Sequence, residues 1–185
     1  MVRTHAFSKG LYMNRKSLSL AVFAAILFSI LAANCGYYSF SGSTLPGHIK
    51  TVAVPTFGNR TSEFGVPEDL TDALIEEFTK DNTLKVADRR SADSMIHGEI
   101  TNIRDQAGAY NQNEQVSEIK VYVTVNVAFD DLKKNQTFWD EQITQWGTYN
   151  PDLAPGQGNT TRQEAIQEAI GKIVTEIINK TISNW

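Results

Sequence analysis

An alternating run between Ile119 and Phe129 limits the architecture of this 185-residue chain more than any other feature. Apolar Ile119, Val121, Val123, Val125, Val127 and Phe129 alternate there with Lys120, Tyr122, Thr124, Asn126 and Ala128. A period of two places the apolar set on one face of a β-strand, and that face must be covered. A polar hairpin loop at residues 130–136 predicts that residues 137–147 return as an antiparallel strand.

Two segments have helical periodicity. Residues 67–80 predict one helix, because Pro67 suits a first helical position and apolar residues recur every four positions. These residues are Leu70, Leu74 and Phe78. Thr161 and Glu164 have the spacing of a capping box, which begins a second helix with a wide apolar stripe. Gly171 interrupts that stripe, and we expect it to allow a close approach of this helix to the sheet.

Three further strands complete the expected order. In residues 49–55 the consecutive apolar Val52, Ala53 and Val54 indicate a strand covered on both faces, and residues 57–61 indicate a turn out of it. Residues 84–87 and 94–104 indicate two more strands. This order predicts an α+β fold, with two helices packed on one face of a four- to five-stranded mixed sheet. The other face is then open for a partner.

The first 34 residues differ from the rest of the chain. They carry four basic residues and no acidic one, followed by an apolar run over residues 18–33. This order is typical of a secretory signal peptide. Met13 directly precedes Asn14-Arg15-Lys16 and is a candidate for the true start. We therefore expect a signal peptide at 1–34, a linker at 35–48 and a single α+β domain at 49–185.

Cys35 is the only cysteine and directly follows the apolar run. Leu31, Ala32 and Ala33 fit a bacterial lipobox, in which small residues precede a lipidated cysteine, whereas Asn34 departs from that pattern. We expect a diacylglyceryl thioether on Cys35 and fatty acyl chains such as palmitate, which would anchor the domain to a membrane. Cys35 is followed by Gly36 and not by aspartate, and under the enteric lipoprotein sorting rule this favours delivery to the outer membrane. A free cysteine after an ordinary signal peptide, or an uncleaved anchor, is the alternative.

The chain after residue 34 holds 13 basic and 21 acidic residues, a formal charge of -8. That charge argues against a general nucleic-acid binder. One cysteine excludes a Cys-cluster zinc site, and His48 and His97 have no neighbours at metal-ligand spacing. We expect a structural role for His97, no metal or other cofactor and no enzymatic activity. A periplasmic enzyme is the less favoured alternative.

Two adjacent basic pairs, Arg89-Arg90 and Lys133-Lys134, are notable in an acidic chain. Guanidinium and ammonium groups bind phosphate, so either pair is a candidate contact for an anionic ligand. Neighbouring aspartates offer the alternative that both pairs are solvated loop charges.

Several motifs resemble the lipopolysaccharide-assembly lipoprotein family LptE. They are Cys35-Gly36-Tyr37, the segment from Ile49 to Asn59, the helix around Leu70 to Phe78, and the segment from Ala92 to Ile100. The resemblance implies an outer-membrane lipoprotein that plugs the LptD-type β-barrel translocon, helps it assemble and binds lipopolysaccharide. Lys133 and Lys134, then Arg89 and Arg90, are our candidate contacts for that ligand. The alternative is another structural lipoprotein of the envelope, such as a secretion-pore subunit that self-associates.

Overall fold

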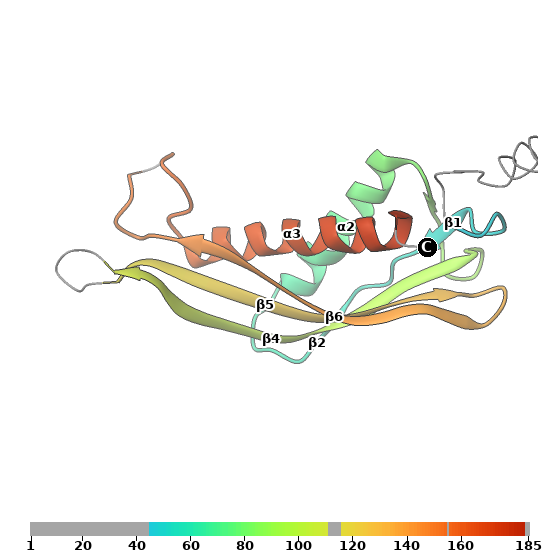
Figure 1. The fold of residues 1–185 in the computed structure, drawn as a ribbon, viewed down its shortest axis with the longest axis horizontal. Helices are drawn as coiled ribbons and strands as arrows, with labels where there is room; N and C mark the ends of the chain where they lie inside the picture. The colour runs from blue at the N-terminus through green and yellow to red at the C-terminus, as the bar shows by residue number, and fades with distance from the viewer. Residues whose placement is uncertain (1–44, 111–115, 155, 184–185) are drawn as a thin grey trace, which may run out of the picture. The chain divides into compact units, whose positions relative to one another are not determined.

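A computed structural model describes residues 45–110, 116–154 and 156–183. The signal peptide, Met13, Cys35 and most of the linker lie outside the described residues, so their assignments stay predictions. The elements are β1 (Thr51–Ala53), β2 (Gly58–Asn59), α2 (Val66–Asp81), β3 (Lys85–Val86), β4 (Ser94–Tyr110), β5 (Val116–Asp131), β6 (Gln136–Tyr149) and α3 (Arg162–Ser183) (Figure 1).

The strands form one mixed sheet in the order β3-β1-β4-β5-β6. β1 is parallel to both β3 and β4, whereas β4, β5 and β6 form an antiparallel meander. β2 is an addition to the expected strands, because Gly58 and Asn59 pair in parallel with Glu99 and Ile100 of β4. Residues 57–61, expected to form only a turn, therefore include a short strand. The predicted α+β class is confirmed.

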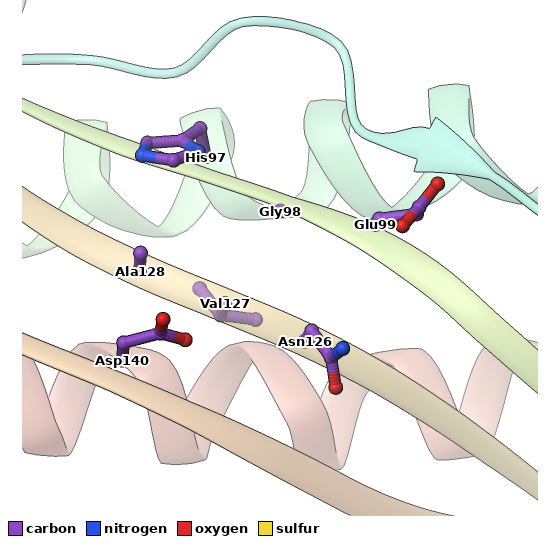
Figure 2. Close-up of a pocket in the computed structure, with 7 residues that line it drawn as sticks. All are labelled: His97, Gly98, Glu99, Asn126, Val127, Ala128 and Asp140. Atoms are coloured by element: carbon purple, nitrogen blue, oxygen red, sulfur yellow. The ribbon is translucent and has the colours of Figure 1, made fainter.

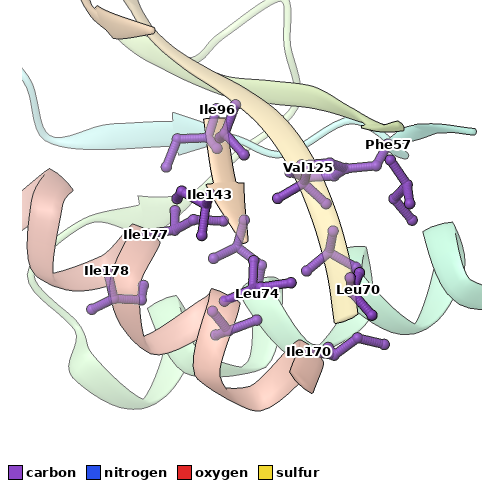
Figure 3. Packing of buried hydrophobic residues seen from close by; sticks show 14 of the residues in the cluster. Phe57, Leu70, Leu74, Ile96, Val125, Ile143, Ile170, Ile177 and Ile178 are labelled. Carbon is purple, nitrogen blue, oxygen red and sulfur yellow. The ribbon is translucent and has the colours of Figure 1, made fainter. Parts of the chain in front are cut away.

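Both helices cover the same face of the sheet (Figure 1). α3 packs on β5 and β6, and α2 packs on α3 and β3. The apolar positions of the alternating run from Val121 to Phe129 point toward the helices and are fully buried, as expected. Figure 3 shows how sheet and helix residues meet in this core, among them Leu70, Leu74, Ile96, Val125, Ile143, Ile170 and Ile177. Neither described helix is long and apolar enough to cross a membrane.

α3 approaches the sheet closely at Gly147 of β6. A Cβ atom at this position would overlap the backbone carbonyl of Ala165 in the first turns of α3. Gly171 is exposed, and a Cβ atom added there would have no neighbour within 4 Å. The expectation that Gly171 provides the close contact is wrong, because that residue lies on the outer face of α3.

The beginning of α3 has the capping box that the sequence predicts. The Thr161 N–H donates to Glu164 Oε2 (2.9 Å), and the Glu164 N–H donates to Thr161 Oγ1 (3.2 Å). These two bonds satisfy backbone donors that have no partner within a helix. The start of α3, and hence its position above β6, is thereby fixed.

Candidate functional site

The two predicted basic pairs lie at the same end of the sheet. Ser94, the first residue of β4, pairs with Asp131 at the end of β5, and the Leu132 N–H donates to the Asp93 carbonyl (2.9 Å). The turn that carries Arg89 and Arg90 therefore lies beside the β5–β6 hairpin that carries Lys133 and Lys134. We call these four exposed residues the basic end.

Within the basic end, Lys133 already has a partner. Its Nζ lies 2.7 Å from Asp93 Oδ1, while Asp93 Oδ2 accepts the N–H groups of Lys50 (2.9 Å) and Thr51 (3.1 Å). The ammonium of Lys133, followed by these donors, holds the pKa of Asp93 far below its ordinary value. The side chains of Lys134, Arg89 and Arg90 form no ion pair with any described residue. These three are the cations available to an anionic ligand.

A second buried carboxylate, Asp131, fixes the hairpin. It accepts the backbone N–H groups of Lys133 (2.8 Å) and Lys134 (2.9 Å), and it lies 2.7 Å from His48 Nε2. Burial raises the pKa of Asp131, but these hydrogen bonds, with that from His48 first, outweigh burial and leave the pKa below its ordinary value. The hairpin that presents the lysines is therefore anchored to His48, the last residue of the predicted linker.

The sheet face opposite the helices holds a shallow hollow above Ala128, which the sequence reasoning did not identify. His97, Glu99, Asn126 and Asp140 surround it on three neighbouring strands (Figure 2). Its volume of about 240 Å³ is below the roughly 300–1,000 Å³ of small-molecule sites. His97 Nε2 lies 2.8 Å from Asp130 Oδ2, a structural contact between β4 and β5. Among the described residues, no group of side chains could hold a metal ion.

Farther along the same face, cations lie over aromatic rings. Arg104 Cζ is 4.4 Å from the ring centroid of Tyr122, and Lys120 Nζ is 4.3 Å from that of Trp146. We call Arg104, Lys120, Tyr122 and Trp146 the cation–aromatic row. This row was not predicted from the sequence either, although the alternation between Ile119 and Phe129 already places Lys120 and Tyr122 on the face away from the core.

Solved structures share the fold at low sequence identity. The hypothetical protein CT253 from Chlamydia trachomatis is 11% identical, with a TM-score of 0.52 over 71% of this chain and 96% of its own. XCC0632 from Xanthomonas campestris is 11% identical, with a TM-score of 0.52 over 75% of this chain and 88% of its own. The PelC dodecamer from Paraburkholderia phytofirmans is 10% identical, with a TM-score of 0.51 over 78% and 96%. These likenesses show the fold alone.

A family model identifies more than the fold. A family model described as lipopolysaccharide-assembly matches residues 49–181, almost the whole of the predicted domain. The match defines the class as an envelope lipoprotein of the lipopolysaccharide-assembly type. The chain belongs to the LptE family, so the resemblance seen in the sequence is confirmed. A search of curated protein sequences found no match.

Proposed function

We propose that this protein is a non-enzymatic outer-membrane lipoprotein that plugs and helps assemble an LptD-type β-barrel translocon. In that role it supports the transport of lipopolysaccharide and its insertion into the outer membrane. The observation that carries the proposal is the family match over residues 49–181.

The anchor in this proposal is lipid attached to Cys35. Two or three acyl chains hold a protein stably at a membrane, since each buried CH₂ contributes about 0.8 kcal/mol. The domain would then occupy the periplasm or the lumen of the barrel. Cys35→Ala is expected to abolish acylation and release the protein into the soluble fraction in cells depleted of the barrel. Retention at native levels in those membranes would contradict an anchor at Cys35.

Affinity purification of the tagged full-length chain from native membranes tests the main proposal. Recovery of a large β-barrel, together with loss of surface lipopolysaccharide on depletion of the lipoprotein, is the expected result. Repeated recovery without a barrel would overturn it. A ring made only of copies of this chain would instead support a secretion-pore subunit.

The basic end is the proposed contact for lipopolysaccharide. Its phosphate groups would bind Lys134, Arg89 and Arg90, which have no ion pair among the described residues, while Lys133 is held by Asp93. The local charge is needed because the chain after residue 34, with 13 basic and 21 acidic residues and a formal charge of -8, has no general attraction for a polyanion. The sheet register supports this assignment, because it gathers both pairs at one end.

A pair of double variants tests this contact. Arg89→Ala with Lys134→Ala is expected to weaken lipopolysaccharide binding about tenfold or more, and to reduce its dependence on salt. Arg60→Ala with Lys80→Ala removes the same charges elsewhere, from residues paired with Glu99 and Glu76. This control should bind as the wild type does. Equal weakening by both variants would show that only net charge matters.

A further inference from the structure

The cation–aromatic row is built by the register of three strands. Arg104 of β4 pairs with Tyr122 of β5, and Tyr122 pairs with Trp146 of β6. Paired residues point to the same side of a sheet. Val121 and Val123, which flank Tyr122 in β5, are buried against the helices, so Tyr122 points to the other face. The row therefore lies on the face away from the helices, with Trp146 on the edge strand β6, where the Lys172 side chain of α3 also reaches its ring.

The two cations of the row lack the ion pairs that Arg60, Lys80, Lys133, Arg162, Lys172 and Lys180 form among the described residues. Neither Arg104 nor Lys120 forms an ion pair with a described carboxylate; the Arg104 guanidinium bonds only to the neutral Gln106 Oε1 (3.2 Å). Their interactions are with the rings of Tyr122 and Trp146. Cation–π contact orients a cation without neutralising it. The row thus presents two oriented positive charges in a domain that is acidic as a whole.

Trp146 is fixed in position from the other side of the strand. Lys172 of α3 donates to the Trp146 carbonyl (2.8 Å), its Nζ lies 4.1 Å from the ring centroid, and it is paired with Glu168 (2.7 Å). The residue as a whole remains 37% exposed. Because its position is held by contacts within the domain, little conformational entropy would be lost when a ligand binds.

The next row of the same face, formed by Asn102, Thr124 and Thr144, is polar and uncharged. The row after it places Asn126 and Gln142 beside Glu99, whose carboxylate is paired with Arg60. Thr124 and Thr144 share a hydrogen bond of 3.0 Å between their hydroxyl groups, and the Gln142 amide donates to Asn126 Oδ1 (3.1 Å). Hydroxyl and amide groups match a ligand that carries many hydroxyl groups, whereas they would leave an acyl chain poorly matched.

Acidic residues farther along this face limit the length of an anionic ligand that could bind at the cation–aromatic row. Glu99 lies in the second polar row, and beyond that row the face carries Asp130 and Asp140; these carboxylates would repel a long polyanion such as a nucleic acid. The pattern along the face is therefore cationic, then neutral and hydrogen-bonding, then acidic. A short ligand with phosphate at one end and sugar hydroxyls behind it fits this order.

We propose that the cation–aromatic row binds a phosphorylated saccharide, with Arg104 and Lys120 on the phosphate and Thr124, Thr144 and Gln142 facing the sugar. This inference rests on the proposed function and deepens it, because lipopolysaccharide contains phosphorylated sugars. The site is separate from the basic end. Ten residues of β4 separate Ser94 from Arg104, or roughly 33 Å at about 3.3 Å per residue.

Calorimetry tests the proposal with a bisphosphorylated glucosamine disaccharide that has no acyl chains, on the detergent-solubilised full-length chain carrying Arg89→Ala and Lys134→Ala, so that the basic end does not contribute to the binding measured. Arg104→Ala with Lys120→Ala should weaken binding at least tenfold, whereas Lys80→Ala with Lys85→Ala should not change it. The unphosphorylated disaccharide and inorganic phosphate should each bind at least tenfold more weakly than the probe. Unchanged binding by the Arg104 and Lys120 variant would overturn the proposal, as would equal binding of inorganic phosphate or an acidic peptide.

Tryptophan fluorescence gives a second readout that a folding defect cannot imitate. The probe should change the emission of the wild type, and Trp146→Phe should remove that change while leaving the melting temperature close to that of the wild type. An unaltered response in Trp146→Phe would place the ligand elsewhere. The double variant at Arg89 and Lys134 should still bind the probe at the row. Barrel co-purification tests the proposed function independently, so failure of this site and failure of that function are distinguishable.

Discussion

Gly147 of β6 lies directly against Ala165 of α3, so closely that a Cβ atom at position 147 would overlap the Ala165 carbonyl. The obstructing atoms belong to the backbone of the helix and cannot rotate away. Val121, the partner of Gly147 across the sheet, is fully buried beneath the same helix. The separation between α3 and the sheet is therefore set by the absence of a side chain at one position.

Gly147→Ala is expected to destabilise the domain by about 1–3 kcal/mol, because overpacking forces the backbone of α3 away from β6. Gly171→Ala is the matched control: its added methyl group meets nothing within 4 Å. It should stabilise α3 by about 0.5–1 kcal/mol, since glycine is unfavourable inside a helix. Urea denaturation monitored by circular dichroism measures both changes. Equal effects of the two substitutions would contradict this account of the packing.

The sequence allowed prediction of those helices and strands whose own residues show a periodic apolar pattern or a capping motif. The alternation around Val125 and the capping box at Thr161 each depend on local chemistry, and both are present in the structure. β2 and the last part of β4 could not be predicted. Gly58 has no strand propensity and pairs only because β4 is beside it. β4 continues to Tyr110, six residues past the expected end at Arg104, because β5 offers it a continuous partner.

The basic end, too, could be predicted only as far as its local sequence signal reached. Adjacent basic residues are visible in the sequence, but the contact between their two loops arises from the pairing of Ser94 with Asp131. The partnership of Lys133 with Asp93 spans two loops and also depends on that register. Which cations are free is therefore a property of the tertiary structure, and charge counting alone does not separate Lys133 from Lys134.

Asp93→Asn is expected to cost about 1–3 kcal/mol at pH 7, because hydrogen bonds to a charged acceptor are worth more than those to a neutral one. The pKa of Asp93 in the folded domain lies below its unfolded value. The ionised carboxylate thus contributes stability above about pH 4, and this contribution is lost as the pH falls further toward the folded pKa. The difference in unfolding free energy between wild type and variant should narrow between about pH 6 and about pH 2.5.

The control for this pH series is Asp72→Asn, on the exposed side of α2. It should stay within about 0.5 kcal/mol of the wild type, as surface substitutions usually do. If the difference in unfolding free energy between wild type and Asp93→Asn stayed constant with pH, the charge of the Asp93 carboxylate would not stabilise this end of the sheet.

Thr161→Ala is expected to destabilise α3 by about 1 kcal/mol, because it removes the oxygen that accepts the Glu164 N–H. Thr175→Ala serves as its control. Thr175 lies within α3, and its hydroxyl bonds to the Gly171 carbonyl (2.9 Å), a contact that competes with helical geometry. Alanine there should be neutral or stabilising by a few tenths of a kcal/mol. Thermal melts of the two variants should therefore shift in different directions, and a common shift would contradict the capping role.

Glu168→Gln is expected to loosen the outer edge of β6. The Glu168 carboxylate accepts the Thr148 N–H (3.2 Å), the Asn159 side-chain amide (2.8 Å) and the Lys172 ammonium (2.7 Å). Burial raises its pKa, but the bond from Lys172 and then that from Thr148 outweigh burial and leave the pKa below its ordinary value. Glutamine retains one oxygen but loses the charge, which weakens these bonds.

Hydrogen exchange at the Thr148 amide measures that loosening. A loss of about 1.4 kcal/mol in local opening free energy corresponds to roughly tenfold faster exchange. Glu77→Gln is the control and should leave the Thr148 exchange rate unchanged; Glu77 is a half-buried acid of α2 whose Oε2 lies 4.0 Å from Lys80 Nζ. Because Lys172 also fixes Trp146, Glu168→Gln should in addition alter the near-ultraviolet circular dichroism of the domain. Faster exchange at Thr148 without that spectral change would show that Lys172 holds the ring without help from Glu168.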